Sequence, residues 1–157
     1  MAIIYETQNF ILETREKPFV ARSEGGHIRI MSKIKVSGRH QLTPDQATEY
    51  LKLSMIAGEA LTIVMKKEGI DIGIVNYQEM GNWSVFKPEG NIMHLHIFGR
   101  AKTATKQKYG EAVLLPQRET GFYDEFESLN EKDIIKMREE IELLLTTNKY
   151  KNFESTF

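Results

Sequence analysis

Two of the chain's four histidines, His94 and His96, lie one residue apart in the stretch IMHLHIFGR, residues 92–100. This stretch is rich in Ile, Leu and Phe, which is typical of a β-strand. Side chains alternate between the two faces of a strand, so both imidazoles share one face at a spacing of roughly 6.5 Å. Two imidazoles at that spacing can contact one small anionic group from neighbouring positions.

Three kinds of chemistry fit such a pair. The histidines can be structural, although each ring then needs a partner for its polar nitrogens. They can bind zinc, with His27 as a third ligand. They can also act on phosphorus, where one neutral imidazole attacks a phosphate to form a covalent phosphohistidine and the second stabilises charge or supplies a proton. The ordinary imidazole pKa near 6.5 suits both tasks.

Composition removes several other functions. The 157 residues suit one domain, and the formal net charge of -1 argues against binding to nucleic-acid polymers or to a membrane surface. The sequence has no cysteine, which excludes disulfides, thiolate metal ligands and a cysteine nucleophile. It shows neither a signal-peptide pattern at its N-terminus nor an apolar run of the roughly 20 residues that a membrane span needs, so we expect a cytoplasmic protein.

The elements that position the histidines follow from local patterns. A long helix is predicted from Pro44 to Gly69, with Thr43 as N-cap and Gln46 completing a capping box. A C-terminal helix is predicted from Asn130, and the tail after residue 148 is expected to fray. Strands are predicted over residues 10–12, 19–21, 27–31, 70–77 and 91–100, and residues 101–128 are expected to be irregular. This order indicates an α+β fold with an antiparallel β-sheet packed against the long helix.

The stretch HLHIFGR resembles the signature strand of the histidine-triad (HIT) superfamily, in which His-x-His-x-His is followed by two apolar residues and often Gly-Arg. Upstream, GGHIRIMSK, LTPDQATEYLKLSMIAGEAL and IGIVNYQ resemble the family's opening strand, its helix and its pocket-lining strand, in that order. The resemblance implies one HIT-like domain over residues 1–157, with a core at about 8–102 and a C-terminal extension with a helix at about 103–157.

Alignment on Gly99-Arg100 makes His94 the middle histidine, which is the nucleophile in the family, and His96 the third. Ile92 then stands where the family has its first histidine, a departure that bears on full activity. In the rival alignment His96 is the nucleophile and Phe98 replaces the third histidine. The first alignment is preferred because it keeps the spacing to Gly-Arg.

The resemblance also implies two substrate-binding residues, His27 and Asn76. A hydroxyl that many members carry just before the signature is absent, and Ser84 is the available substitute. Arg100 is interpreted either as a phosphate contact or as a solvated strand end. Trp83 is interpreted as a cover for a nucleotide base or, preferably, as part of the core or of a dimer interface.

The resulting hypothesis is a phosphohydrolase that cleaves at the α-phosphate of a nucleotide conjugate or dinucleoside polyphosphate through a covalent nucleotidyl-histidine. The alternatives are a HIT-like nucleotide-binding protein with weak or no catalysis and a nucleotidyltransferase that uses the same histidine. No cofactor and no metal are expected. The resemblance implies a homodimer, and neither a nucleic-acid polymer nor a membrane is an expected partner.

Overall fold

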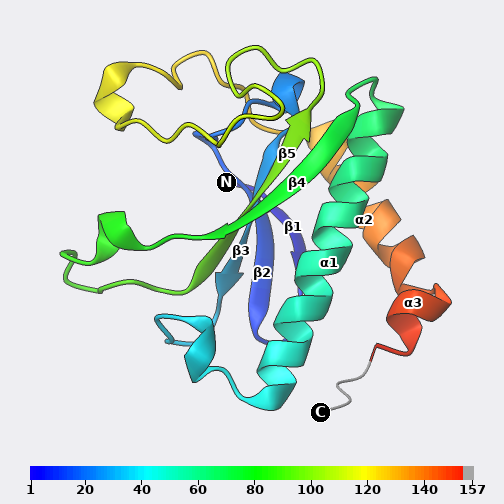
Figure 1. Cartoon of the computed structure of the whole chain (residues 1–157). Coiled ribbons are helices and arrows are strands. Elements are labelled where there is room, and N and C mark those ends of the chain that lie inside the picture. Colours follow the sequence, from blue (N-terminus) through cyan, green and yellow to red (C-terminus); the bar gives the residue numbers. More distant parts are fainter. Residues whose placement is uncertain (154–157) are drawn as a thin grey trace.

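A computed structural model describes residues 1–153 as one antiparallel sheet with its helices on one side (Figure 1). The strands are β1 (Ile3–Glu6), β2 (Phe10–Thr14), β3 (His27–Ser32), β4 (Ile72–Glu79) and β5 (His94–Ala101). They lie in the order β1-β2-β3-β5-β4, and every neighbouring pair is antiparallel. The helices are α1 (Pro44–Lys67), α2 (Glu131–Leu145) and α3 (Asn148–Lys151). The predicted α+β class is therefore confirmed.

Both long helices begin at the residues that their sequence signals indicate. The Thr43 side chain accepts from the backbone N–H of Gln46, whose own side chain accepts from the Thr43 N–H. Asn130 and Asp133 form the same reciprocal pair at the start of α2. These bonds satisfy backbone donors that the first helical turn leaves without partners, so the two helix starts are locally encoded.

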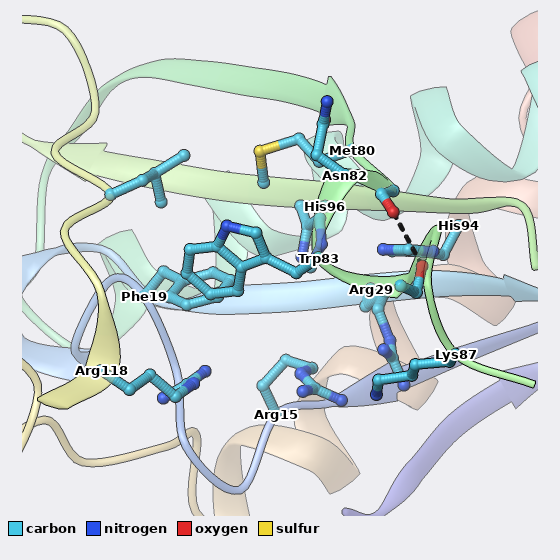
Figure 2. Close-up of a pocket in the computed structure, with 13 residues that line it drawn as sticks. Arg15, Phe19, Arg29, Met80, Asn82, Trp83, Lys87, His94, His96 and Arg118 are labelled. Carbon is cyan, nitrogen blue, oxygen red and sulfur yellow. Dashed lines mark hydrogen bonds between the residues drawn. The ribbon is translucent and has the colours of Figure 1, made fainter. Parts of the chain in front are cut away.

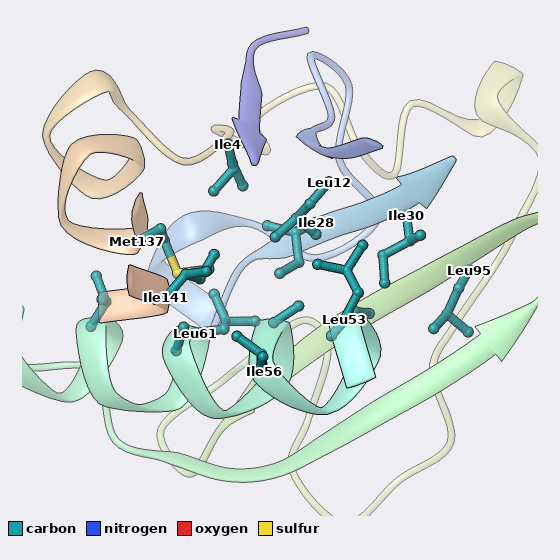
Figure 3. Close-up of a cluster of buried hydrophobic side chains, with 14 of the residues drawn as sticks. Ile4, Leu12, Ile28, Ile30, Leu53, Ile56, Leu61, Leu95, Met137 and Ile141 are labelled. Carbon is teal, nitrogen blue, oxygen red and sulfur yellow. The ribbon is translucent and has the colours of Figure 1, made fainter. Parts of the chain in front are cut away.

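The main hydrophobic core lies between the sheet and α1, and α2 closes it at one end (Figure 3). Ile28 and Ile30 of β3, with Leu95 and Ile97 of β5, point into this core and are almost fully buried. Each such side chain stabilises the fold by roughly 1.5–3 kcal/mol. The strand alternation therefore leaves the intervening residues of β3 and β5 on the opposite face of the sheet. That opposite face carries the histidines.

Residues 19–21 do not form the predicted strand. They follow an irregular path, because Phe19, Val20 and Ala21 pack into a second hydrophobic cluster on the histidine face of the sheet, with Phe98, Tyr123 and Phe126. The apolar character of this segment thus serves packing rather than strand pairing. The edge strand β1, which the patterns did not predict, pairs with β2.

The end of the described chain is also more ordered than predicted. Instead of fraying after residue 148, it forms the short helix α3, in which Tyr150 is fully buried. The Tyr150 hydroxyl donates to Glu59 Oε2 of α1 at 2.5 Å. A single aromatic anchor therefore holds this turn against the long helix. Among residues 1–153, no helix is both long enough and apolar enough to span a membrane.

Arg100 is neither a phosphate contact nor a solvated strand end. It is 2% exposed, and its guanidinium donates to Asn76 Oδ1 and to the backbone carbonyls of Gln107, Lys108 and Glu111. These carbonyls belong to the irregular segment that follows β5. The arginine therefore ties that segment to the sheet, using donors in several directions that a lysine cannot supply.

The glycine before Arg100 allows two backbone segments to approach closely. A Cβ atom on Gly25, whose φ is +122°, would lie 2.3 Å from the carbonyl oxygen of Gly99. Gly99 N–H donates to Gly26 O at 3.0 Å across the same contact. The loop before β3 is thus pressed directly onto β5, next to the histidines.

We expect Gly25→Ala to lower the free energy of unfolding by about 3 kcal/mol or more, because it combines a left-handed backbone with a backbone clash. Gly69→Ala is the matched control, since Gly69 also has a positive φ, +82°, but nothing lies within 4 Å of its added Cβ. That control should cost roughly 1–2 kcal/mol. Urea denaturation measures both values, and equal losses would contradict the close-approach argument.

Candidate active site

A cavity of about 400 Å³ opens on the histidine face of the sheet (Figure 2). Its wall combines β3, β5, the loop after β2, the β4–β5 connection and the C-terminal extension. The lining residues are Arg15, Phe19, Arg29, Met80, Gly81, Asn82, Trp83, Ser84, Lys87, His94, His96, Leu115 and Arg118. Both histidines of the HLH stretch therefore reach one cavity, as strand alternation requires.

His94 has a defined orientation. Its Nδ1 lies 2.7 Å from the backbone carbonyl oxygen of Ile92. A carbonyl oxygen only accepts hydrogen bonds, so Nδ1 carries the hydrogen. In the neutral ring the other nitrogen, Nε2, then holds a free lone pair. His94 therefore combines an oriented ring with a nitrogen that can attack an electrophile.

This hydrogen bond does not depend on the side chain at position 92. Ile92 contributes its backbone carbonyl to His94, and that group is the same in every residue type. The Ile92 side chain is itself 37% exposed and precedes β5. The acceptor that orients His94 therefore requires no imidazole at position 92.

His96 is oriented by a chain of hydrogen bonds that begins at a backbone amide. Phe19 N–H donates to His27 Nδ1 at 3.0 Å, so His27 carries its hydrogen on Nε2. That Nε2 lies 2.9 Å from His96 Nδ1, which must therefore accept. In neutral His96 the remaining hydrogen is on Nε2. The ring consequently has an N–H donor, rather than a lone pair, left to offer a ligand.

All three rings favour the neutral form. Burial, followed by the positive charge of His96, places the pKa of His27 well below its ordinary value. Burial lowers the pKa of His96 to about 3, with His94 and three arginines adding to the effect. Burial also lowers the pKa of His94, against a smaller opposing effect from its hydrogen bond to Ile92. At neutral pH the cavity therefore contains one free nitrogen lone pair, on His94 Nε2, and one N–H donor, on His96 Nε2.

Four cationic side chains surround these rings: Arg15, Arg29, Lys87 and Arg118. Arg29 lies on β3 directly opposite His96 and forms an ion pair with Glu13. No Asp or Glu is among the residues that line the cavity within the described part of the chain. The cavity is thus positive although the chain as a whole has a net charge of -1, and it is suited to an anionic ligand.

The cavity also has an aromatic side. Trp83 is half exposed and makes an edge contact with Phe19, with ring centroids 5.8 Å apart. Trp83 therefore belongs to the cavity wall and not to the core. Ser84 lies beside it, but its hydroxyl donates to Gly81 O at 2.8 Å, with Asn91 Oδ1 at 3.1 Å. The available hydroxyl is therefore already engaged.

The other two predicted site residues lie behind the cavity wall. His27 is fully buried and is connected to the cavity through two lining residues, His96 and Phe19, to which it is hydrogen-bonded. Asn76 uses its Oδ1 to accept from Arg100 at 3.0 Å and is not a lining residue. The zinc alternative offered His27 as a possible third ligand, but both ring nitrogens of His27 already have hydrogen-bond partners. Within residues 1–153 no three His, Cys, Asp or Glu side chains are grouped as metal ligands.

The sequence patterns did not identify the four cationic side chains that line the cavity. A signal for Arg29 was present, because strand alternation places it on the same face as His27. Arg15 and Arg118 had no such signal, since Arg15 lies in the loop after β2 and Arg118 begins a short 3₁₀ helix far away in the sequence, in the C-terminal extension. Only tertiary contacts bring them to one cavity.

The overall fold resembles solved structures of histidine-triad proteins. A histidine triad protein from Bradyrhizobium japonicum is 14% identical with a TM-score of 0.58, over 89% of this chain and 90% of that one. A hypothetical histidine triad nucleotide-binding protein from Sulfolobus tokodaii is 15% identical with a TM-score of 0.56, over 98% and 90% of the two chains. The chain has the histidine-triad fold. A uridylyltransferase shares this fold at 14% identity and a TM-score of 0.56, over 92% of this chain and 42% of that one.

The histidine-triad likeness is thus one of three-dimensional structure. No protein-family model and no curated protein sequence matches the chain. At these identities the likeness establishes the fold, and the chemistry has to be argued from the side chains themselves.

We expect the free energy of unfolding to fall as the pH decreases from about 7 to 5. In the unfolded chain His27 and His96 regain the ordinary pKa near 6.5 and bind protons, whereas their lowered pKa values keep them neutral in the folded state. Acid therefore favours the unfolded chain. Urea denaturation at several pH values measures the slope of the free energy of unfolding against pH.

The variant His27→Gln should reduce this slope, because an amide can both accept from Phe19 and donate to His96 but does not titrate. His40→Gln is the control, since His40 is exposed and lies outside the cavity. An unchanged slope in His27→Gln would show that burial of this ring does not govern the acid response.

Proposed function

We propose that the protein is a nucleotide-binding phosphohydrolase that cleaves at the α-phosphate of a nucleotide conjugate or dinucleoside polyphosphate. The observation that carries this proposal is the pairing of a free lone pair on His94 with an N–H donor on His96 in one cationic cavity. Nucleophilic attack on phosphorus needs both groups: one to form the new bond and one to stabilise charge on the phosphoryl oxygens.

In the first step His94 Nε2 attacks the α-phosphorus. The new N–P bond forms as the bond from phosphorus to the leaving group breaks, and the leaving group takes the electron pair. The ring becomes positively charged, and Ile92 O stabilises that charge through the hydrogen on Nδ1. His96 donates a hydrogen bond from its Nε2–H to a phosphoryl oxygen and keeps the proton, while His27 is a positioning residue that holds this hydrogen on Nε2.

In the second step water attacks the nucleotidyl-histidine. The new O–P bond forms, the N–P bond breaks, Nε2 recovers its electron pair and the water proton passes to solvent. The protein then returns to its starting protonation state. No step requires a metal ion or cofactor on the protein.

A nucleotidyltransferase reaction is the second candidate. It shares the first step and differs only in the acceptor of the second, and the uridylyltransferase among the structural neighbours makes it worth testing. Adding candidate acceptors such as phosphate to the assay separates the two reactions. The homodimer that the resemblance implies stays a prediction, which light scattering of the purified protein checks.

We expect His94→Ala to reduce turnover of a dinucleoside tetraphosphate or a nucleoside phosphoramidate by at least about 10³-fold, because it removes the nucleophile. His96→Ala should cost roughly 10²–10³-fold through loss of charge stabilisation. His40→Ala is the control and should leave turnover unchanged. Mass spectrometry of quenched wild-type protein should detect a nucleotidyl adduct on His94.

Two results would contradict this assignment. A loss confined to His96→Ala would favour His96 as nucleophile. Nucleotide binding without turnover on either substrate would indicate a binding protein, and Ile92→His would then be the variant to build.

We expect kcat/KM to decrease on the acid side only when the pH falls below about 6.5. His94 must be neutral to attack, and its lowered pKa keeps it neutral to more acid pH than an ordinary histidine. Since kcat/KM reports groups of the free enzyme, its acid limb should lie below 6.5. An acid limb clearly above 6.5 would exclude the titration of a buried His94 as its cause.

A further inference from the structure

We propose that Arg15 and Arg118 form a subsite for a phosphate leaving group, so that the favoured substrates are phosphoanhydrides rather than phosphoramidates. This inference rests on the proposed function and names the substrate class within it. The observations behind it concern the cationic side of the cavity, away from the nitrogen atoms of the two histidines. Figure 2 shows Arg118, Arg15 and Lys87 along one side of the cavity, with the two histidine rings beside them.

Among residues 1–153, the Arg15 guanidinium has only one weak hydrogen-bond partner. Its Nε is buried without a hydrogen bond, and its Nη1 reaches only the sulfur of Met1 at 3.2 Å, a weak acceptor. The neighbouring carboxylate of Glu13 pairs with Arg29 instead. A guanidinium on a cavity wall whose N–H groups lack hydrogen-bond partners can donate those hydrogen bonds to an anionic ligand.

In the described part of the chain, Arg118 is held in place by contacts other than a carboxylate. Its Nη2 donates to the backbone carbonyl of Lys17 at 2.9 Å. Its guanidinium carbon lies 4.6 Å from the ring centroid of Phe19 and 5.4 Å from that of Tyr123. Stacking on the two aromatic rings and one hydrogen bond to the backbone fix the guanidinium group of Arg118. Its other N–H groups stay available for a ligand.

The cations also repel one another. Burial, then the charge of Arg29, lowers the pKa of Arg15, and Arg118 contributes in the same direction. A bound polyanion relieves this repulsion, and one phosphate beside His94 leaves most of it uncompensated. The charge of the cavity therefore fits a ligand with several phosphate groups.

Leaving-group chemistry supports the same class independently. An amine leaves phosphorus only when it gains a proton, whereas a terminal phosphate, with a pKa near 6, leaves as an anion. The described cavity wall has no carboxylic acid, and the Ser84 hydroxyl is engaged with Gly81 O. His96 has a pKa of about 3 and so donates a hydrogen bond but is not protonated as an acid. The site thus stabilises negative charge far better than it delivers protons.

The first test compares turnover of a dinucleoside tetraphosphate with that of a phosphoramidate of the same nucleoside. Arg15→Gln and Arg118→Gln should each lower kcat/KM for the tetraphosphate by roughly 10- to 100-fold, as expected for a charged hydrogen bond. The kcat/KM for the phosphoramidate should change less than about threefold. Arg15→Lys, which keeps the charge, should recover part of the activity.

Lys17→Gln is the matched control, because it removes one positive charge from the same loop at an exposed residue outside the cavity. It should affect both substrates little. Equal losses on the two substrates in Arg15→Gln and Arg118→Gln, or no loss on the tetraphosphate, would overturn the leaving-group subsite while leaving hydrolysis intact.

The second test needs no turnover and so separates this inference from the proposed function. Calorimetry should show that inorganic tripolyphosphate binds His94→Ala protein at least about tenfold more tightly than orthophosphate, and that Arg15→Gln in this background removes the preference. Equal affinities for the two anions would overturn the subsite. Retained preference with an inactive wild type would uphold the subsite and reject the hydrolase.

Discussion

The hydrogen bond from Phe19 N–H to His27 Nδ1 determines which ring nitrogens carry hydrogen in His27 and His96. A backbone amide can only donate, so it fixes the tautomer of His27, and His27 in turn fixes that of His96. The donor that His96 offers a ligand therefore originates at a loop residue and not in the strand that carries the histidines. Any movement of Phe19 relative to β3 would free both rings to exchange tautomers.

The C-terminal extension holds that loop in place. Gln107, which is fully buried, donates from its side chain to Phe19 O at 2.8 Å. The Glu24 carboxylate accepts from the backbone N–H groups of Thr105, Lys106 and Gln107. Arg100 binds the same segment from the sheet side. The extension is thus part of the machinery that positions the histidines, in addition to supplying Arg118 to the cavity wall.

The charge of the cavity differs from the charge of the chain. A net charge of -1 argues against a basic surface of the kind that binds nucleic-acid polymers, but a whole-chain sum says nothing about a local field. Acidic side chains elsewhere balance the cations that line the cavity. One of them, Glu13, is committed to Arg29, so the remaining cations determine which ligand the cavity favours.

The sequence by itself determined the features that depend on neighbouring residues. The two capping boxes, the long helix and the alternation of β5 are all local, so Thr43, Asn130 and the shared face of His94 and His96 could be read directly. A tertiary structure was needed where the partner lies far along the chain. The packing of residues 19–21, the burial of Arg100 and the meeting of Arg15 with Arg118 depend on such contacts. Periodicity encodes which face a side chain occupies, but it does not encode which distant group supplies its hydrogen bond. In this protein the neighbouring Ile92 carbonyl leaves the free lone pair on His94, whereas the distant Phe19 amide, acting through His27, leaves His96 with an N–H donor.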